Sequence, residues 1–307
     1  MKIRRIDSPP ENVDQFVSEI VPAYERLYGT EPAEVYRATG AHHISTAIAH
    51  PAIEAFGGFQ GKQAEALLLL KRGQDRDTVS FLHTLEGRNR EDRANAILDY
   101  SLAQIATGPA RAILSEYIPF MPDCLDRTYF RHDFRRVDRQ LMGRHGAPPA
   151  PAQGRFNLQI GHVEDWRPLA HVLYEAYASH PERMLFDEVQ SAQAAEGFLA
   201  QTAAGMYGPC PEDFVVSAWD EGRCIGVALG CEVVAGTGFV LHMAVLPSQR
   251  GGGLGTLLFD RLSANFAAYG LKRSLLAVTC TNPATRLYAR AGFDAVHTFP
   301  VYYRPKR

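Results

Sequence analysis

The stretch from residue 245 to residue 256 has the clearest chemical meaning in the chain. Glycines at positions 251, 252, 253 and 255 follow an apolar run that ends at Val245, and apolar residues at helical spacing begin at Leu257. Glycine adopts positive φ without strain and lets the backbone approach a ligand closely. Free N–H groups at the start of a helix attract anions, and phosphate suits them best. The stretch therefore predicts a phosphate-binding turn between a strand and a helix.

Two common phosphate motifs do not fit this turn. A Walker loop ends in Gly-Lys-Ser/Thr, and there is no lysine near Gly255. The dinucleotide fingerprint Gly-x-Gly-x-x-Gly needs a glycine at position 256, where this chain has Thr256. The phosphate group that the turn binds therefore belongs to a different kind of ligand.

A second strand and helix follow downstream. Residues 275–282 read as a buried strand that ends at Asn282. Pro283 fits the first turn of a helix, and Gly292 fits a helix end. The helix and its end carry five residues at fixed spacing, namely Ala284, Leu287, Tyr288, Gly292 and Phe293.

Together the two patterns resemble the GNAT superfamily of N-acetyltransferases over about residues 156–307. Arg250-x-x-Gly253-x-Gly255 resembles the family's acyl-CoA pyrophosphate loop, and the second pattern resembles its closing element. Asn282 lies one residue closer to the alanine than in the family pattern. The resemblance implies that the pyrophosphate is held by Arg250, Gly251, Gly252, Gly253, Leu254, Gly255 and Thr256.

The same resemblance implies roles for three further parts of the site. The backbone of Met243, Ala244 and Val245 binds the acyl carbonyl. Asn282 contacts the cofactor on its pantetheine side, and Tyr288 protonates the leaving thiolate. The implied activity is transfer of an acetyl group from acetyl-CoA, as co-substrate, to a primary amine. We expect a small-molecule acceptor and direct attack in a ternary complex.

The general base is open between two residues and a third possibility. His242 lies on the strand before the turn, and an imidazole suits proton transfer near neutral pH. Glu232 lies on the preceding strand. The family often uses water chains, so a dedicated base is not required. Aromatic residues on segments that border the family's acceptor cleft are Tyr177, Phe186, Tyr207, Tyr302 and Tyr303, and Asp187 and Glu188 can hold an ammonium.

Two other functions stay open. The acceptor could be a protein N-terminus, a lysine, or the thiol precursor that mycothiol synthase, another tandem GNAT enzyme, acetylates. The protein could also be an acyl-CoA-binding sensor without turnover. The lack of one clear general base favours a sensor, and the presence of Tyr288 argues against it. An amine panel tested against a peptide panel separates these functions.

Composition narrows the class of protein. A length of 307 residues suggests two domains at about 150 residues each. The formal net charge of −2 does not suggest a nucleic-acid binder. Five cysteines form no CxxC pair, and His42 and His43 lack further ligands, so we expect no metal. The first ten residues have no apolar h-region and no apolar run is long enough for a membrane span, so we expect neither a signal peptide nor a membrane helix, and we expect a cytoplasmic protein.

The fold class expected is α/β (α+β), with two GNAT-like domains in tandem, each a mixed twisted sheet flanked by helices. We expect a degenerate domain at 1–142, a Pro/Gly/Ala-rich linker at 143–155 and the catalytic domain at 156–307. In the catalytic domain the order is strand, two helices, three strands, helix, strand, helix and a last strand at 297–304. In the first domain we expect a strand at 1–7, a helix ending at Gly29, a hairpin of 64–70 and 78–85, a helix at 94–105 and a strand at 110–120.

An internal repeat supports the tandem arrangement. Residues 127–137 align with residues 286–296 at an offset of 159, and five of eleven positions agree. The counterpart of the glycine turn then follows Leu85 and has one glycine, with arginines from Arg88 to Arg93 that would crowd a pyrophosphate. We therefore expect that the N-terminal copy does not bind CoA. It shapes the acceptor site or mediates dimerisation, so the protein is a monomer or a homodimer.

Overall fold

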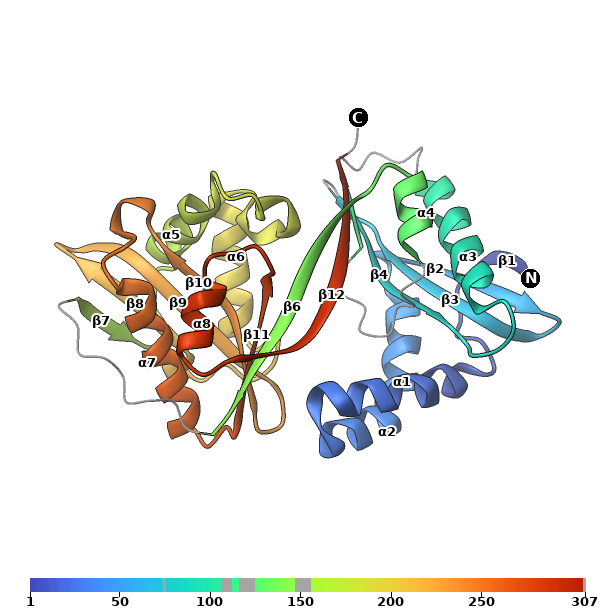
Figure 1. The fold of residues 1–307 in the computed structure, drawn as a ribbon, viewed down its shortest axis with the longest axis horizontal. Helices are drawn as coiled ribbons and strands as arrows, with labels where there is room; N and C mark the ends of the chain where they lie inside the picture. Colours follow the sequence, from blue (N-terminus) through green and yellow to red (C-terminus); the bar gives the residue numbers. More distant parts are fainter. Residues whose placement is uncertain (74–75, 106–111, 116–124, 147–155, 306–307) are drawn as a thin grey trace. The chain divides into compact units, whose positions relative to one another are not determined.

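The chain divides into two compact units. The computed structural model describes all residues except 74–75, 106–111, 116–124, 147–155 and 306–307 (Figure 1). Unit 1 consists of Met1–Asp138 and Phe299–Arg307, and unit 2 consists of Arg139–Thr298. Each unit therefore takes its residues from both sides of the sequence position where a linker was expected. Within the described residues, no helix has the length and apolar character to cross a bilayer.

Unit 1 has a mixed sheet with the order β1-β2-β3-β4-β5-β12. Its strands are β1 (Lys2–Ile6), β2 (Ile53–Gln60), β3 (Gln63–Lys71), β4 (Arg76–Thr84), β5 (Ala112–Ser115) and the end of β12 (Asp294–Pro305). Its helices are α1 (Val13–Tyr28), α2 (Thr30–Ala49), α3 (Arg90–Ile105) and α4 (Asp126–Arg131). Both faces of this sheet carry an apolar core. Leu67 and Leu69 pack with residues of α1 and α2, whereas Leu68 and Leu70 pack with residues of α3 and α4, which explains the unbroken apolar run in β3.

Unit 2 has a second mixed sheet with the order β6-β11-β10-β9-β8-β7. Its strands are β6 (Arg135–His145), β7 (Asn157–Ile160), β8 (Val215–Asp220), β9 (Arg223–Val234), β10 (Thr237–Val245) and β11 (Arg273–Thr279). Its α-helices are α5 (Arg167–Tyr177), α6 (Ala192–Ala203), α7 (Leu254–Ala268) and α8 (Thr285–Arg290). Its short 3-10 turns are η2 (Arg183–Leu185), η3 (Asp187–Val189), η4 (Glu212–Phe214) and η5 (Pro247–Gln249). The element order expected for the catalytic domain is the order observed.

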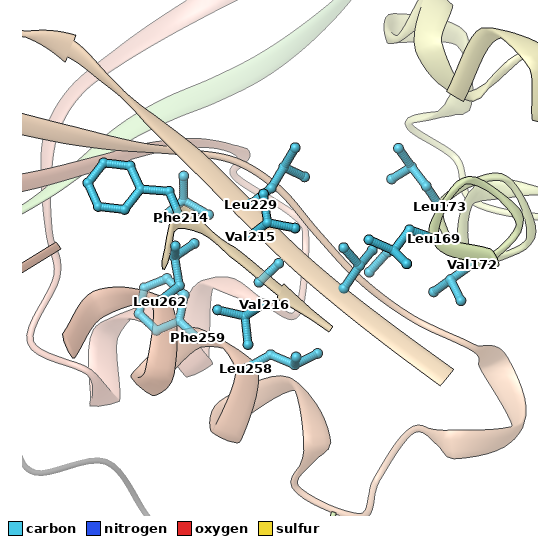
Figure 2. Packing of buried hydrophobic residues seen from close by; sticks show 14 of the residues in the cluster. Leu169, Val172, Leu173, Phe214, Val215, Val216, Leu229, Leu258, Phe259 and Leu262 are labelled. Atoms are coloured by element: carbon cyan, nitrogen blue, oxygen red, sulfur yellow. The ribbon is translucent and has the colours of Figure 1, made fainter. Parts of the chain in front are cut away.

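Helices cover both faces of the second sheet. Figure 2 shows Leu169, Val172 and Leu173 of α5 on one side of the strands that carry Val215, Val216 and Leu229. Leu258, Phe259 and Leu262 of α7 lie on the other side, and Phe214 packs near them. All ten of these residues are buried. Residues of both β10 and α7 belong to this core, so the turn between them is fixed at both of its ends.

Strand β10 separates from its neighbour halfway along its length. It pairs with β9 from Thr237 to Val245, with a bulge between Val240 and His242. It pairs in parallel with β11 only from Thr237 to Val240. The end of β10 nearest the glycine turn is therefore open on the β11 side, and this opening positions the site described below.

Several boundaries differ from the sequence expectation. The sequence patterns did not indicate α2 or β2. Gly40 lies inside α2, where an added Cβ would come within 2.9 Å of Val17 on α1, so helix packing rather than local propensity explains this glycine. In the first domain the hairpin of β3 and β4 is confirmed, and the strand expected at 110–120 is seen as β5, with 110–111 and 116–120 outside the described residues.

The first residues of the expected linker belong to a strand, and the last strand, expected at 297–304, is β12, whose end pairs within unit 1. Gly143 belongs to β6 and pairs with Leu275 of β11. The absence of a side chain at this position leaves room for the side chains of Leu275 and Val296. The rest of the expected linker, residues 147–155, lies outside the described residues. The end of β12 pairs with β5 in unit 1, where Tyr302 stacks on Tyr129 at 3.9 Å between ring centroids.

The internal repeat has the same local structure in both copies. Helices α4 and α8, and strands β6 and β12, start at positions exactly one repeat offset apart. Between helix and strand, Asp133 and Gly292 both have positive φ, at 62° and 82°. The same offset relates Tyr129 to Tyr288, and His83 of β4 to His242 of β10, and all four side chains are buried. The repeat is therefore a property of the fold and not only of a short sequence match.

Candidate active site

A cavity of about 300 Å³ lies where β10 separates from β11 in unit 2. Its wall includes residues 240–245 of β10 and 276–278 of β11. The remaining lining residues come from five other segments and are Arg139, Ala176, Tyr177, His180, Glu182, Phe186, Arg250, Asn282, Pro283, Ala284 and Tyr288. The cavity brings together Met243, Ala244, Val245, His242, Arg250, Asn282 and Tyr288, which are predicted site residues far apart in the sequence.

The glycine turn leads from β10 to α7 at one end of this cavity. Gly251 and Gly253 have φ of 81° and 85°, in the left-handed region that side chains disfavour. Gly253 is the N-cap of α7, and no atom lies within 4 Å of a Cβ built on either glycine. Gly255 differs, because it lies in α7 and an added Cβ would meet Leu287 at an ordinary 3.6 Å. The turn is therefore shaped by backbone conformation, and it leaves space in front of the first N–H groups of α7.

Arg250 fixes the entry to this turn. Its guanidinium donates to the carbonyl of Ala176 at 2.8 Å and to that of Val245 at 3.3 Å. These bonds join the end of α5 to the end of β10. The residue remains exposed, so its charge lies beside the open start of α7.

His242 and Glu188 form a pair at the bulge of β10. The Nε2 atom of His242 lies 2.7 Å from a carboxylate oxygen of Glu188 in η3. The imidazole is 5% exposed, and Tyr177, Phe186 and Phe198 surround it with ring centroids 5.1 to 5.7 Å away. Its Nδ1 atom is buried and has no hydrogen-bond partner among the described residues. With a proton on Nε2 held by Glu188, Nδ1 carries the lone pair that can accept another proton.

Tyr288 is buried in the cavity wall with its phenol near Glu182. Burial, and secondly the negative charge of Glu182, raise the pKa of Tyr288 above its usual value. Burial and the neighbouring Glu182 also raise the pKa of Tyr177. Tyr288 therefore stays protonated at neutral pH and can donate a proton.

Asn282 has both ends of its amide engaged within the protein. Its oxygen accepts a hydrogen bond from the Ala284 N–H at 2.9 Å, just before α8. Its nitrogen donates to Glu182 at 2.9 Å. The side chain thus connects the start of α8 to Glu182, and its predicted cofactor contact needs one of these bonds to be exchanged or shared.

Glu232 does not belong to the cavity, contrary to the expectation that it could act as a base. Its carboxylate accepts a hydrogen bond from the Gly236 N–H at 2.7 Å, which closes the turn between β9 and β10. Among the predicted aromatics, Tyr177 and Phe186 line the cavity, whereas Tyr207 and Tyr302 do not. Cys280, which directly follows β11, is exposed.

The sequence patterns did not indicate three polar residues of the cavity. Glu182 is buried, His180 accepts a hydrogen bond from the Glu182 N–H, and Arg139 enters from β6. Glu182 and His180 lie in an irregular segment without a motif. Arg139 precedes the expected linker, in a part of the sequence assigned to the other domain. Only the pairing of β6 with β11 brings it to the site.

The counterpart turn in unit 1 is filled by arginines. Arg93 donates to the Leu85 carbonyl at 2.5 Å and pairs with Glu65 at 3.4 Å. Arg90 donates to the Thr84 carbonyl at 3.0 Å. These side chains turn back onto the end of β4, where unit 2 has an open glycine turn. The His83 imidazole still pairs with a carboxylate, Glu19, at 3.2 Å.

Known proteins match this architecture. Residues 171–293 match the model of the acetyltransferase (GNAT) family. No curated protein sequence matches the chain significantly. Among solved structures, the chain is similar to a GCN5-related N-acetyltransferase from Sphaerobacter thermophilus, with 18% identity, a TM-score of 0.70, and coverage of 99% of this chain and 95% of that one.

Two further structures cover the whole chain. A tandem GNAT protein from the clavulanic acid biosynthesis pathway is 14% identical, with a TM-score of 0.57 and coverage of 99% and 98%. A GNAT-family acetyltransferase from Colwellia psychrerythraea is 15% identical, with a TM-score of 0.52 and coverage of 100% of both chains. The predicted family resemblance and the predicted fold class are confirmed.

Proposed function

Because the C-terminal unit carries a domain of the GNAT acetyltransferase family, we propose that it transfers the acetyl group of acetyl-CoA to a primary amine of a small molecule. The transfer is a direct attack within a ternary complex. The observation that carries this proposal is that His242, which pairs with Glu188, and the protonated Tyr288 line one cavity at the open end of β10.

The residues present fit an acyl-CoA. The space in front of Gly251 and Gly253, the free N–H groups of α7 and the charge of Arg250 suit a pyrophosphate. The N–H groups on the β11 side of Met243 to Val245 have no strand partner there, so they can donate to a carbonyl oxygen as it gains charge. Bound acetyl-CoA supplies the thioester carbonyl that the amine attacks and the thiolate that leaves.

The side chains of the cavity supply the proton transfers. His242 accepts the proton that the amine loses, and Glu188 orients the imidazole and stabilises its charged form. Tyr288 donates a proton to the departing sulfur. The cavity volume of about 300 Å³ favours a small acceptor over a folded protein surface.

The N-terminal copy does not bind CoA in this proposal. Arg90 and Arg93 occupy the end of β4 where a pyrophosphate would approach. We therefore expect one CoA per chain by calorimetry. The described cysteines Cys210, Cys224 and Cys231 form no disulfide, which supports a reducing compartment such as the cytoplasm.

A thiol-release assay with acetyl-CoA tests the function. Small amines, amino acids and N-terminal peptides are compared as acceptors on the intact chain, and CoA binding is measured separately by calorimetry. Turnover with small amines supports the proposal. Turnover only with peptides would show that the acceptor is a peptide or protein and not a small molecule. CoA binding without turnover on any acceptor would identify a sensor. Absence of CoA binding removes the role assigned to Arg250–Gly255.

A further inference from the structure

The cavity is lined by a half-buried cation that the acetyl transfer does not use. Arg139 lines the cavity from β6, and its guanidinium carbon lies 5.1 Å from the centroid of the Phe186 ring. Its Nη2 atom donates to the Ala277 carbonyl at 3.0 Å. Its Nε atom is buried without a hydrogen-bond partner among the described residues. A guanidinium has five N–H donors in one plane, so this side chain has capacity left for a ligand.

The charge of Arg139 is only partly balanced by the protein. Burial lowers its pKa from the ordinary arginine value, and the negative charges of Glu182 and Glu188 oppose this effect. Arg139 forms no salt bridge with a carboxylate of the described residues, whereas Glu182 accepts a hydrogen bond from Asn282 and Glu188 pairs with His242. Removing a charge from water costs free energy unless a partner group compensates for the lost hydration. A cation of this kind in a ligand cavity indicates an anionic group on the ligand.

We propose that the amine acceptor also carries a carboxylate, which Arg139 binds, so that the substrate class is free amino acids. This inference rests on the proposed acetyl transfer. The planar guanidinium fork matches a carboxylate with two parallel hydrogen bonds. Arg139 and His242 both contact the Phe186 ring, at 5.1 and 5.4 Å. The carboxylate group and the amine of one small molecule can therefore reach the guanidinium and the imidazole together.

A purely structural role for Arg139 makes a different prediction. If the guanidinium only balances Glu182 and Glu188, its removal lowers turnover equally for every acceptor. If it binds the substrate carboxylate, its removal affects only acceptors that have one. The ratio of kcat/KM between matched acceptors therefore separates the two roles.

The test compares three acceptors that differ at one group: L-lysine, L-lysinamide and cadaverine, with a second set of L-phenylalanine, L-phenylalaninamide and phenethylamine. The intact wild-type chain is compared with Arg139→Gln and Arg139→Lys. Arg144→Gln is the matched control, because Arg144 is on the same strand, bonds to the Ala291 carbonyl and lies over Phe293, outside the cavity.

We expect the wild type to prefer the amino acid of at least one set by roughly 10- to 100-fold in kcat/KM, the range of a charge-assisted hydrogen-bonded pair. Arg139→Gln should abolish that preference, and Arg144→Gln should retain it. Equal use of acid, amide and amine by the wild type overturns the proposal, as does a preference that survives Arg139→Gln.

Calorimetric titration of the same acceptors in the presence of CoA gives a readout that does not depend on turnover. If no acceptor is acetylated, the proposed transfer fails. The substrate proposal then stands only if the amino acid binds more tightly than its amide and Arg139→Gln removes that difference. Binding without such a difference overturns it.

Discussion

Tyr288 and Tyr129 occupy equivalent positions of the internal repeat, and their replacement by phenylalanine should have opposite effects. In unit 2, none of the described residues forms a hydrogen bond with the Tyr288 hydroxyl, and the ring packs on Phe259 with centroids 5.1 Å apart. In unit 1, the Tyr129 hydroxyl donates to Ser115 Oγ at 2.7 Å inside the core. The same chemical change therefore removes a proton donor in one unit and a structural hydrogen bond in the other.

The expected magnitudes follow from these surroundings. Tyr288→Phe keeps the packed ring, so the free energy of unfolding should change by less than about 0.5 kcal/mol. Loss of a general acid should lower kcat by about 10²- to 10⁴-fold, which corresponds to about 3 to 5 kcal/mol in the barrier. Tyr129→Phe leaves the Ser115 hydroxyl buried without its donor and should cost about 1 to 3 kcal/mol of stability with kcat unchanged.

Three measurements on both variants test this reasoning. Thiol release with acetyl-CoA and the best acceptor gives kcat, urea unfolding gives stability, and calorimetry gives the affinity for CoA. Retention of full kcat by Tyr288→Phe would refute the role of Tyr288 as the acid. A loss of kcat that follows a loss of stability in this variant would equally refute it, because the effect would then be structural.

Three further predictions concern the turn, the base and the dependence of stability on pH. Gly253→Ala should destabilise the protein by about 1 to 2 kcal/mol and weaken CoA binding, because Gly253 has φ of 85°. Gly255→Ala should not destabilise the protein, because Gly255 is at a helical position and the nearest neighbour of an added Cβ lies at 3.6 Å. Equal urea midpoints for the two variants would contradict the assignment. Glu188→Gln should lower kcat/KM by roughly 10- to 100-fold and have no additional effect on top of His242→Ala, since Glu188 acts through the imidazole; additive losses would show that it acts separately. Above pH 10 the urea midpoint should fall, because burial raises the pKa of several tyrosines, including Tyr36 to about 12, so that the unfolded chain releases their protons first. Each such tyrosine contributes a loss of about 1.4 kcal/mol per pH unit between its unfolded and folded pKa, and a midpoint that stays constant between pH 9 and pH 12 would contradict this.

The sequence indicated the parts of the candidate site that depend on local backbone conformation. The glycine turn could be predicted because positive φ at Gly251 and Gly253 favours glycine. The order of elements in the C-terminal half was legible because apolar periodicity changes at each turn. The pairing of two repeats was visible in a short segment around Tyr129 and Tyr288, and the structure extends it to His83 and His242.

The parts that sequence reasoning missed depend on tertiary contacts. Glu188 was named only as a group that could hold an ammonium, and its pairing with His242 comes from the path of the chain between α5 and α6. Glu232 had a suitable type and strand, but a turn hydrogen bond retains it elsewhere. Arg139 could not be assigned to the site, because a strand pairing across the expected domain boundary positions it.

The discontinuity of unit 1 has a consequence for the order in which the protein folds during synthesis. Unit 2 is one uninterrupted segment, Arg139–Thr298, whereas unit 1 needs Phe299–Arg307 to supply the strand that pairs with β5. The half of the chain that leaves the ribosome first therefore completes its sheet last. Until β12 arrives, the edge of β5 stays exposed to wrong partners, as unpaired sheet edges are. We expect a released chain that ends before residue 299 to bind chaperones through unit 1.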